Sequence, residues 1–419
     1  MISLIKKPQR YTPANNPIIW QVVSDNTALR RFRVDVIETT TNSTISTLEF
    51  DPFPDELYGT NFDLSRILSS FVKNEVKPYT NLIDTFSVSI LSYRLKITER
   101  IISGNMIVDG DVLDNPASAF YVWNASMDSL TFKYYKTRQY VVNVNQPVKF
   151  LTNKPNFSAV NDFSVEGLSF MQENTVPLSV EFKFYDASNT LLQTYSTTIP
   201  NQSTVKQYRI TVSPKYLQLI PIDFAAVSYY SVVLKDDAGN EVSEKRTYLY
   251  EKLACNLSPV SLFWINTLGV YDSCQFVNPQ YAINYDRLLI KKNPLKVNSS
   301  GQYSEFDGPV FNSIQDIISV NPKATISVYS QPLTDEEDKW LSEMFLSKKV
   351  FMQLENEVVP ILISNSSYNI NQQKYLSGDL NTKRIDFNIS ADILPTYKII
   401  PSTGSVGTID AVHSDFYNK

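Results

Sequence analysis

Apolar and polar side chains alternate with a period of two over much of this chain, a pattern typical of β-strands that bury one face. Residues 32–39 show it clearly, because charged side chains separate Phe32, Val34 and Val36. Segments of this kind recur from residue 18 to residue 389, and turn-forming residues separate many of them. The pattern therefore predicts a chain built mainly of β-strands.

Two short segments depart from this period, and both are predicted helices. Over residues 64–73, apolar side chains recur every three or four positions, after Asp63 in the place of an N-cap. Over residues 335–348, Thr334 and Glu337 stand at capping-box spacing, and neighbouring acids favour the positive end of a helix. Each helix has one apolar face, and we expect that of the first helix to lie on the preceding sheet.

The predicted strands fall into three units, followed by a tail. We place an N-terminal β domain with the first helix at residues 1–115, a β-sandwich domain at 116–254, a C-terminal β domain with the second helix at 255–400, and a flexible tail at 401–419. The expected strands are 18–24, 32–39, 87–95 and 93–102 in the first unit, 129–134, 140–144, 179–185, 191–198, 206–212 and 228–234 in the second, and one starting at 261, then 285–292, 325–329, 350–354, 358–364 and 385–389 in the third.

The middle unit carries the clearest fold signal. Its strands recur about every ten residues, and the polar sequences at 185–189 and 235–240 read as hairpin turns between them. This spacing is typical of immunoglobulin or fibronectin sandwiches. The sequence therefore predicts a mainly β, multi-domain protein of such sandwich modules with two short helices, and it leaves the strand order open.

Composition supports this class and narrows the function. The chain has 25 Tyr and 23 Phe, which suit strands, and a net charge of −5. Without a basic surface it gains little from releasing counterions, so we expect no sequence-specific nucleic-acid binding. No apolar run reaches the roughly 18 residues that a membrane span needs, and the N-terminus shows no signal-peptide core. We expect synthesis in a cytoplasm.

Catalytic chemistry is mostly excluded by residue type. His413 is the only histidine, which removes histidine-based triads, Cys–His pairs and multi-histidine metal sites. Glycine-rich phosphate loops are absent from the sequence. We therefore predict no enzyme, and no catalytic, cofactor-binding or metal site.

Three acidic clusters need a separate test, because paired carboxylates can hydrolyse glycans or bind calcium. They are Asp51 with Asp55 and Glu56; Asp109 with Asp111 and Asp114; and Asp335, Glu336, Glu337 and Asp338. The first lies in a proline-rich loop, the second misses the calcium-loop spacing, and the third suits helix capping. Solvated or capping roles are expected.

Cysteines and aromatic residues are predicted to be structural. Cys255 and Cys274 lack metal-ligand neighbours and should be buried thiols. The four tryptophans are dispersed, so each is expected to anchor its own core, not a sugar-binding platform. They are Trp20, Trp123, Trp264 and Trp340. One tyrosine of each pair, Tyr134-Tyr135 and Tyr229-Tyr230, should point outwards, where a neighbouring subunit could cover it.

Three groups of motifs, in a fixed order, span most of the chain. They are NPIIWQVVSD at 16–25 with Phe53-Pro and FDLSRIL at 62–68; SLFWINTLGVYDS at 261–273; and LTDEEDKWLSEMF at 333–345 with VFMQL at 350–354 and VPILISNSSY at 359–368. In this order they resemble the structural tail and neck ring proteins of crAss-like podophages, which infect Bacteroidetes-type bacteria. The middle unit adds no such motif.

The resemblance implies a virion structural protein of the phage tail or neck. It implies a closed ring of identical copies, expected to be dodecameric, next to other ring proteins and to the portal or tail hub. Head-to-tail contacts between copies close such a ring by rotation, and exposed sheet edges could pair across subunits. Two other functions stay open: a receptor- or glycan-binding tail spike or fibre, and a carboxylate-dependent glycan hydrolase.

Overall fold

The computed structural model describes residues 1–398 apart from short gaps. The gaps are 54–57, 78, 80, 115–118, 137–138, 143–146, 174–176, 201–203, 218–219, 221, 253–257, 294, 298–299, 308–309, 312, 355–356, 371–380 and 391–396. Cys255, His413 and the tail predicted at 401–419 therefore lie outside the described residues. Within them the protein is mainly β and consists of several packed β modules, which confirms the predicted fold class.

The N-terminal module is a sandwich of two sheets. One sheet has the order β1 (Ile2–Lys6), β3 (Ile19–Ser24), β6 (Gly59–Asp63), and the other β2 (Tyr11–Pro13), β10 (Phe120–Trp123), β8 (Ile90–Ser103), β4 (Leu29–Glu38), β5 (Thr44–Phe50), with β9 (Met106–Asp114) also on β8. Alternate side chains of both sheets, such as Trp20 and Val34, meet in one core. The helix α1 (Ser65–Phe71) adds Leu68 to it.

The middle module is a second sandwich. Its sheets have the orders β11 (Val141–Val142), β13 (Gly167–Gln172), β16 (Lys206–Thr211), β7 (Ile83–Phe86), and β12 (Phe157–Val160), β18 (Arg246–Tyr250), β17 (Tyr229–Asp236), β14 (Leu178–Tyr185), β15 (Leu191–Ile199). The predicted hairpin turn at 185–189 joins β14 to β15, and these strands pair antiparallel. Phenylalanines from both sheets, including Phe170 and Phe182, fill the core.

The C-terminal module is a closed barrel. Its sheet has the order β20 (Tyr271–Lys291), β19 (Val260–Ile265), β26 (Val350–Leu354), β27 (Glu357–Ile363), β28 (Arg384–Ile389), β25 (Gln315–Ser330), β29 (Tyr397–Lys398), and β20 also pairs with β25. That last pairing closes the ring of strands and leaves no edge there. Helices α4 (Asp335–Leu341) and α5 (Glu343–Leu346) contribute Trp340 and Met344 to the core.

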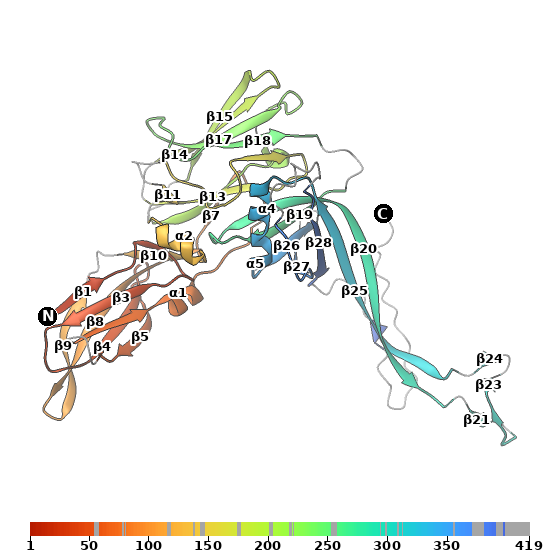
Figure 1. Cartoon of the computed structure of the whole chain (residues 1–419), viewed down its shortest axis with the longest axis horizontal. Coiled ribbons are helices and arrows are strands. Elements are labelled where there is room, and N and C mark those ends of the chain that lie inside the picture. The colour runs from red at the N-terminus through yellow and green to blue at the C-terminus, as the bar shows by residue number, and fades with distance from the viewer. Residues whose placement is uncertain are drawn as a thin grey trace.

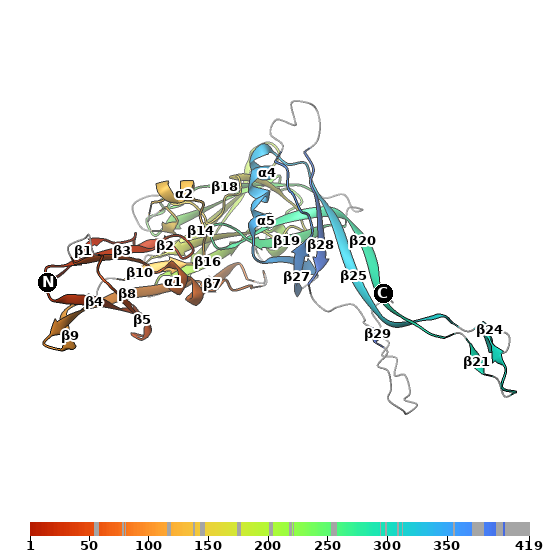
Figure 2. The ribbon, with the colours of Figure 1, turned by 60° about the horizontal axis from the view of Figure 1, so that its bottom comes forward.

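The three modules differ in their place in the molecule (Figure 1). The N-terminal module forms one end, and the middle module and the barrel lie side by side. From the barrel, β20 and β25 run on together as a long ribbon to the opposite end, as both views show (Figures 1 and 2). Near its far end lie two short pairs, β21 (Lys296–Val297) with β22 (Tyr303–Ser304), and β23 (Phe306–Asp307) with β24 (Val310–Phe311).

Local predictions needed four corrections. Residues 129–134, predicted as a strand, form the helix α2 (Ser129–Tyr134), because the Asp128 side chain accepts hydrogen bonds from the amides of Leu130 and Thr131. The helix α3 (Pro214–Leu217) was not predicted. The first predicted helix, 64–73, ends at Phe71, and the second, 335–348, is broken at Ser342 into α4 and α5.

Two strands pair across the module boundary predicted at residue 115. Strand β7, from the predicted N-terminal domain, pairs with β16 of the middle module. Strand β10, from beyond the boundary, pairs with β8 and β2 of the N-terminal module. The chain therefore crosses between the first two modules more than once, which hydrophobic spacing alone does not indicate.

Candidate functional site

The ribbon of β20 and β25 is the candidate functional site. Its ladder pairs Gln280 with Ser327 near the barrel and Lys291 with Gln315 at the far end. Among the described residues, only β28 near the base and the two-residue β29 add to the β25 side, and no strand pairs with the outer edge of β20 beyond Phe276. Residues 280–291 extend roughly 40 Å at about 3.3 Å per residue.

The two faces of the ribbon differ in polarity. Side chains two residues apart on a strand point to the same face, and so do side chains directly opposite each other in an antiparallel ladder. Tyr281, Ile283 and Tyr285 therefore share one face, and their side chains are 66%, 40% and 55% exposed. The other face carries Asn284 and Asp286, and Asp286 forms an ion pair with Lys323 across the ladder, Oδ2 to Nζ 2.6 Å. Over residues 281–285 one face is thus apolar and open to solvent, and Arg287 follows on the same face.

The sequence only partly indicated this ribbon. Residues 285–292 and 325–329 were predicted as separate strands, whereas they belong to one continuous pair. The alternation of Tyr281, Ile283 and Tyr285 was a further signal of period two. That these strands would leave the barrel could not be read from a local pattern.

The described acids of the first two clusters are held in ion pairs. Asp51 accepts a hydrogen bond from Arg31 Nε at 2.8 Å, while Asp55 and Glu56 lie outside the described residues. On β9, Asp109, Asp111 and Asp114 form ion pairs with Arg33 and Arg100, the N-terminal ammonium and Arg94, respectively. No group of three metal-ligating side chains occurs among the described residues.

The third cluster is mainly helix-capping chemistry, as predicted, with one exception. Thr334 and Glu337 form a complete capping box, in which each side chain bonds the backbone of the other. Asp338 is instead fully buried. Its carboxylate meets Lys383 Nζ at 2.9 Å and accepts a hydrogen bond from Asn381 Nδ2 at 3.0 Å. Asp338 therefore joins α4 to the segment before β28.

The tryptophans are buried, so none offers a surface platform for sugars. Trp20 lies in the N-terminal core, as predicted. Trp264 and Trp340 share the barrel core, with ring centroids 5.0 Å apart. Trp123 lies at a junction, where its indole N–H donates to the Leu268 carbonyl oxygen at 2.9 Å. Two of the four thus share one core, and a third joins two modules.

The tyrosine pairs divide as predicted between buried and outward positions. Tyr135 and Tyr230 are buried, and Tyr134 is exposed at the end of α2. Tyr229 is half-buried and stacks on Tyr185, with ring centroids 4.7 Å apart. Of these four tyrosines, Tyr134 is therefore the one that is fully open for a contact outside the chain.

A buried polar network joins the middle module to the barrel. Lys154 Nζ donates to both carboxylate oxygens of Glu166 at 2.8 Å, and these side chains are only 12% and 9% exposed. In the barrel, Asp272 accepts hydrogen bonds from Thr152 Oγ1 at 2.9 Å and from Trp340 Nε1 at 2.7 Å. Burial raises the pKa of both the Glu166 and the Asp272 carboxyls. The network holds two modules in one fixed relation.

Cys274, beside this network, is predicted to be unreactive. Its side chain is half-buried and not fully buried as predicted, and desolvation raises the pKa of its thiol to about 12. At pH 8, roughly one molecule in ten thousand then carries a thiolate, so alkylation should be about a thousandfold slower than for a free thiol. Mass spectrometry of a Cys255→Ser variant with iodoacetamide would measure this, with the urea-unfolded chain as control. A rate in the native chain equal to that of the unfolded chain would contradict the prediction.

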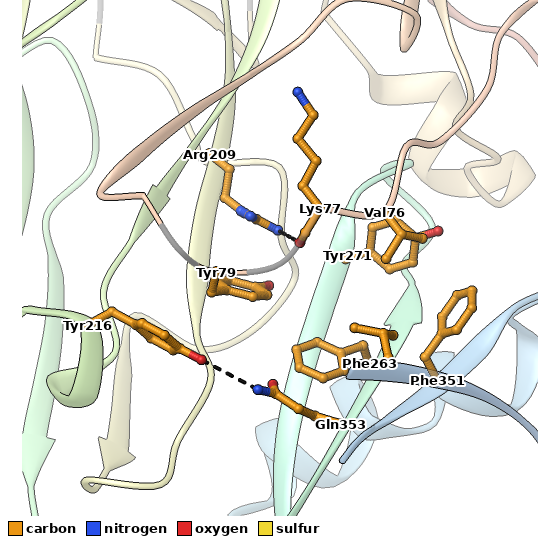
Figure 3. Close-up of a pocket in the computed structure, with 10 residues that line it drawn as sticks. Val76, Lys77, Tyr79, Arg209, Tyr216, Phe263, Tyr271, Phe351 and Gln353 are labelled. Carbon is orange, nitrogen blue, oxygen red and sulfur yellow. Dashed lines mark hydrogen bonds between the residues drawn. The ribbon is translucent and has the colours of Figure 1, made fainter. Parts of the chain in front are cut away.

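A cavity of about 100 Å³ lies where the middle module meets the barrel (Figure 3). Its walls are mainly aromatic, with Tyr79, Phe263 and Phe351 among them. The polar groups at its rim bond one another: Arg209 donates to the Lys77 carbonyl oxygen at 3.0 Å, and the Gln353 amide to the Tyr216 hydroxyl at 3.4 Å. The cavity is therefore part of the packing between modules.

Comparison with known proteins adds no identity. No protein-family model and no curated protein matches this chain. Across the described residues, no helix is long and apolar enough to cross a membrane.

Solved structures with some likeness include calcium binding domain CBD12 of CALX1.1 (8% identity, 56% of this chain, 78% of that chain, TM-score 0.16). Another is Dpr2 Ig1-Ig2 in complex with DIP-Theta Ig1-Ig3 (10% identity, 60% of this chain, 98% of that chain, TM-score 0.14). A third is a marsupial T cell receptor (10% identity, 78% of this chain, 95% of that chain, TM-score 0.17). Such low TM-scores do not bear on function, and the fold class rests on the sheets themselves.

Proposed function

We propose that this chain is a virion structural protein that forms a homo-oligomeric ring in a phage tail or neck. The observation that supports it most is the ribbon, whose apolar face carries Tyr281, Ile283 and Tyr285 in the open. Exposing an apolar surface of this kind to water is unfavourable, and exposed apolar surfaces are typical of sites of protein contact. A ribbon that leaves its own fold is suited to reach a neighbouring subunit.

The ring form is supported by the asymmetry of the chain and by the family resemblance of its motifs. The ribbon lies at one end of the molecule, and in this proposal a different surface of the neighbouring copy receives it (Figure 1). Contacts between two different surfaces are heterologous and close into a ring when the rotation permits. In this proposal the ring is dodecameric, resides in the virion, and links portal-proximal components to the distal tail.

The decisive measurement is the mass and symmetry of the purified full-length chain. Native mass spectrometry and electron microscopy should show one closed cyclic oligomer of high copy number. A chain that stays monomeric at all concentrations would contradict the proposal. A stable trimer that binds glycans would favour a tail spike or fibre instead.

Shortening the ribbon should abolish assembly and spare the fold. Ala282 and Thr325 face each other in the ladder, so an Asn-Gly turn can replace residues 283–324 and close the hairpin. Because the barrel pairing of 325–329 with β28 is kept, the melting temperature should stay within a few degrees of the wild type. Sedimentation velocity should find a monomer. Unchanged oligomers would show that the ribbon is not the assembly element.

A further inference from the structure

We propose that the open edge of β15 in the middle module receives β20 from the ribbon of a second copy of this chain. The inference rests on the proposed function and deepens it, because it names the surface that receives the ribbon. Strand addition of this kind gains backbone hydrogen bonds along two edges that are otherwise unpaired.

Strand β15 is an unprotected edge. It is the last strand of its sheet and pairs only with β14 among the described residues. Its sequence, LLQTYSTTI, contains no charged residue and no proline, and Leu191 and Leu192 are 49% and 43% exposed. Natural proteins guard long edge strands with charges, prolines or bulges, because such edges recruit other strands. The ladder with β14 is irregular at Leu192, so the unguarded edge is the stretch from Gln193 to Ile199, which is still suited to accept a strand.

Two other long outer strands, β5 and β9, are guarded by contrast. The edge strand β5 carries Glu49, which pairs with Arg31, and β9 carries Asp109, Asp111 and Asp114. Docking another strand there would bring charged side chains into a new sheet. The composition of the edges therefore favours β15 over β5 and β9.

The ribbon offers a matching strand. Residues 280–285, Gln-Tyr-Ala-Ile-Asn-Tyr, are also free of charge, and their outer edge has no partner among the described residues. Pairing this stretch with β15 would therefore bury no charged side chain, which is the costly event in joining two sheets.

The interior of the middle sandwich is open at the same edge. Tyr195 of β15 lies opposite Phe182 of β14, so both side chains point inwards. Phe182 is fully buried, whereas Tyr195 and its inward neighbours Gln193 and Thr197 are only half-buried. A strand added beyond β15 with its apolar face inwards would cover them. The face with Tyr281, Ile283 and Tyr285 fits that role.

The test places lysines on either face of the same strand in the full-length chain. In an inward variant, Gln193→Lys with Thr197→Lys, the new charges can reach water in the free chain but would be covered by the docked ribbon. We expect the concentration for half-assembly to rise at least about tenfold. The matched outward control, Thr194→Lys with Ser196→Lys, has the same charge change on the exposed face and should assemble as the wild type does.

Mixing gives a second readout that does not depend on loss of function. The inward variant keeps its ribbon, and the chain with residues 283–324 replaced keeps its β15 edge. At a concentration between the half-assembly values of the wild type and the inward variant, each alone should be monomeric, and together they should form a one-to-one dimer and nothing larger. If the inward variant forms wild-type rings while the shortened chain does not, the ribbon docks elsewhere and only this inference falls. If the wild-type chain is monomeric, the ring proposal falls with it.

Discussion

Replacing Lys154 by methionine should destabilise the protein by about 3 to 5 kcal/mol. The substitution keeps most of the side-chain volume. In the wild type both carboxylate oxygens of Glu166 accept hydrogen bonds from Lys154, so the variant leaves Glu166 buried without its ion-pair partner. An uncompensated buried charge either pays for desolvation or takes up a proton. Urea denaturation monitored by circular dichroism would measure the change in the free energy of unfolding.

Two control variants separate this effect from the loss of any lysine. Lys183 forms an ion pair with Glu181 at 3.2 Å in a more exposed position, so Lys183→Met should cost at most about 1 kcal/mol. Adding Glu166→Gln to Lys154→Met removes the orphaned charge and should restore part of the lost stability. Equal costs for the two lysine variants would mean that the buried pair contributes no more than an exposed one.

Replacing Gly269 by alanine should cost about 2 to 5 kcal/mol, the sum of two physical terms. Its φ of +82° is a left-handed conformation that costs an L-residue about 1 to 2 kcal/mol. A Cβ there would also lie 2.4 Å from the carbonyl oxygen of Asn124, and overpacking costs about 1 to 3 kcal/mol. Because that contact is with backbone, the N-terminal module would have to shift from the barrel. Thermal unfolding would detect the loss.

Gly239 provides the matched control for this prediction. Its φ is +83°, almost the same, but a Cβ added at this residue would meet no atom within 4 Å. Gly239→Ala should therefore show the conformational cost alone. If both variants lost the same stability, the close approach of Asn124 to Gly269 would carry no energetic weight.

Features that depend on neighbouring residues were accessible from the sequence. The capping box of Thr334 and Glu337 and the hairpin of β14 and β15 both formed as predicted. The strand predicted at 129–134 was wrong because the apolar residues there fit the period of a strand or of a helix. The hydrogen bonds that the Asp128 side chain accepts as N-cap favour the helix. Local patterns are reliable when the period and the end signals agree.

Features that depend on distant pairings were not accessible. Barrel closure requires β20 to meet β25, whose first paired residues, Phe276 and Ser330, are far apart in the chain. The partner of Lys154 was equally hidden, since nothing in the sequence distinguishes Glu166 from the other acids. The candidate site was only partly indicated for the same reason. A strand pattern tells which residues share a face, and it does not tell where the strand leaves its fold.

The placement of β7 also determines how early the middle sandwich can fold during synthesis. Asp84, on this strand, pairs with Arg209, which follows 125 residues later in the chain. At 5 to 20 residues per second, the ribosome needs about 6 to 25 s to deliver that partner. During this time the strand β7 has no β16 to pair with. All strands of the N-terminal sandwich are present once Trp123 has emerged, whereas a nascent chain halted before residue 206 would expose β7 of the middle sandwich without its partner β16.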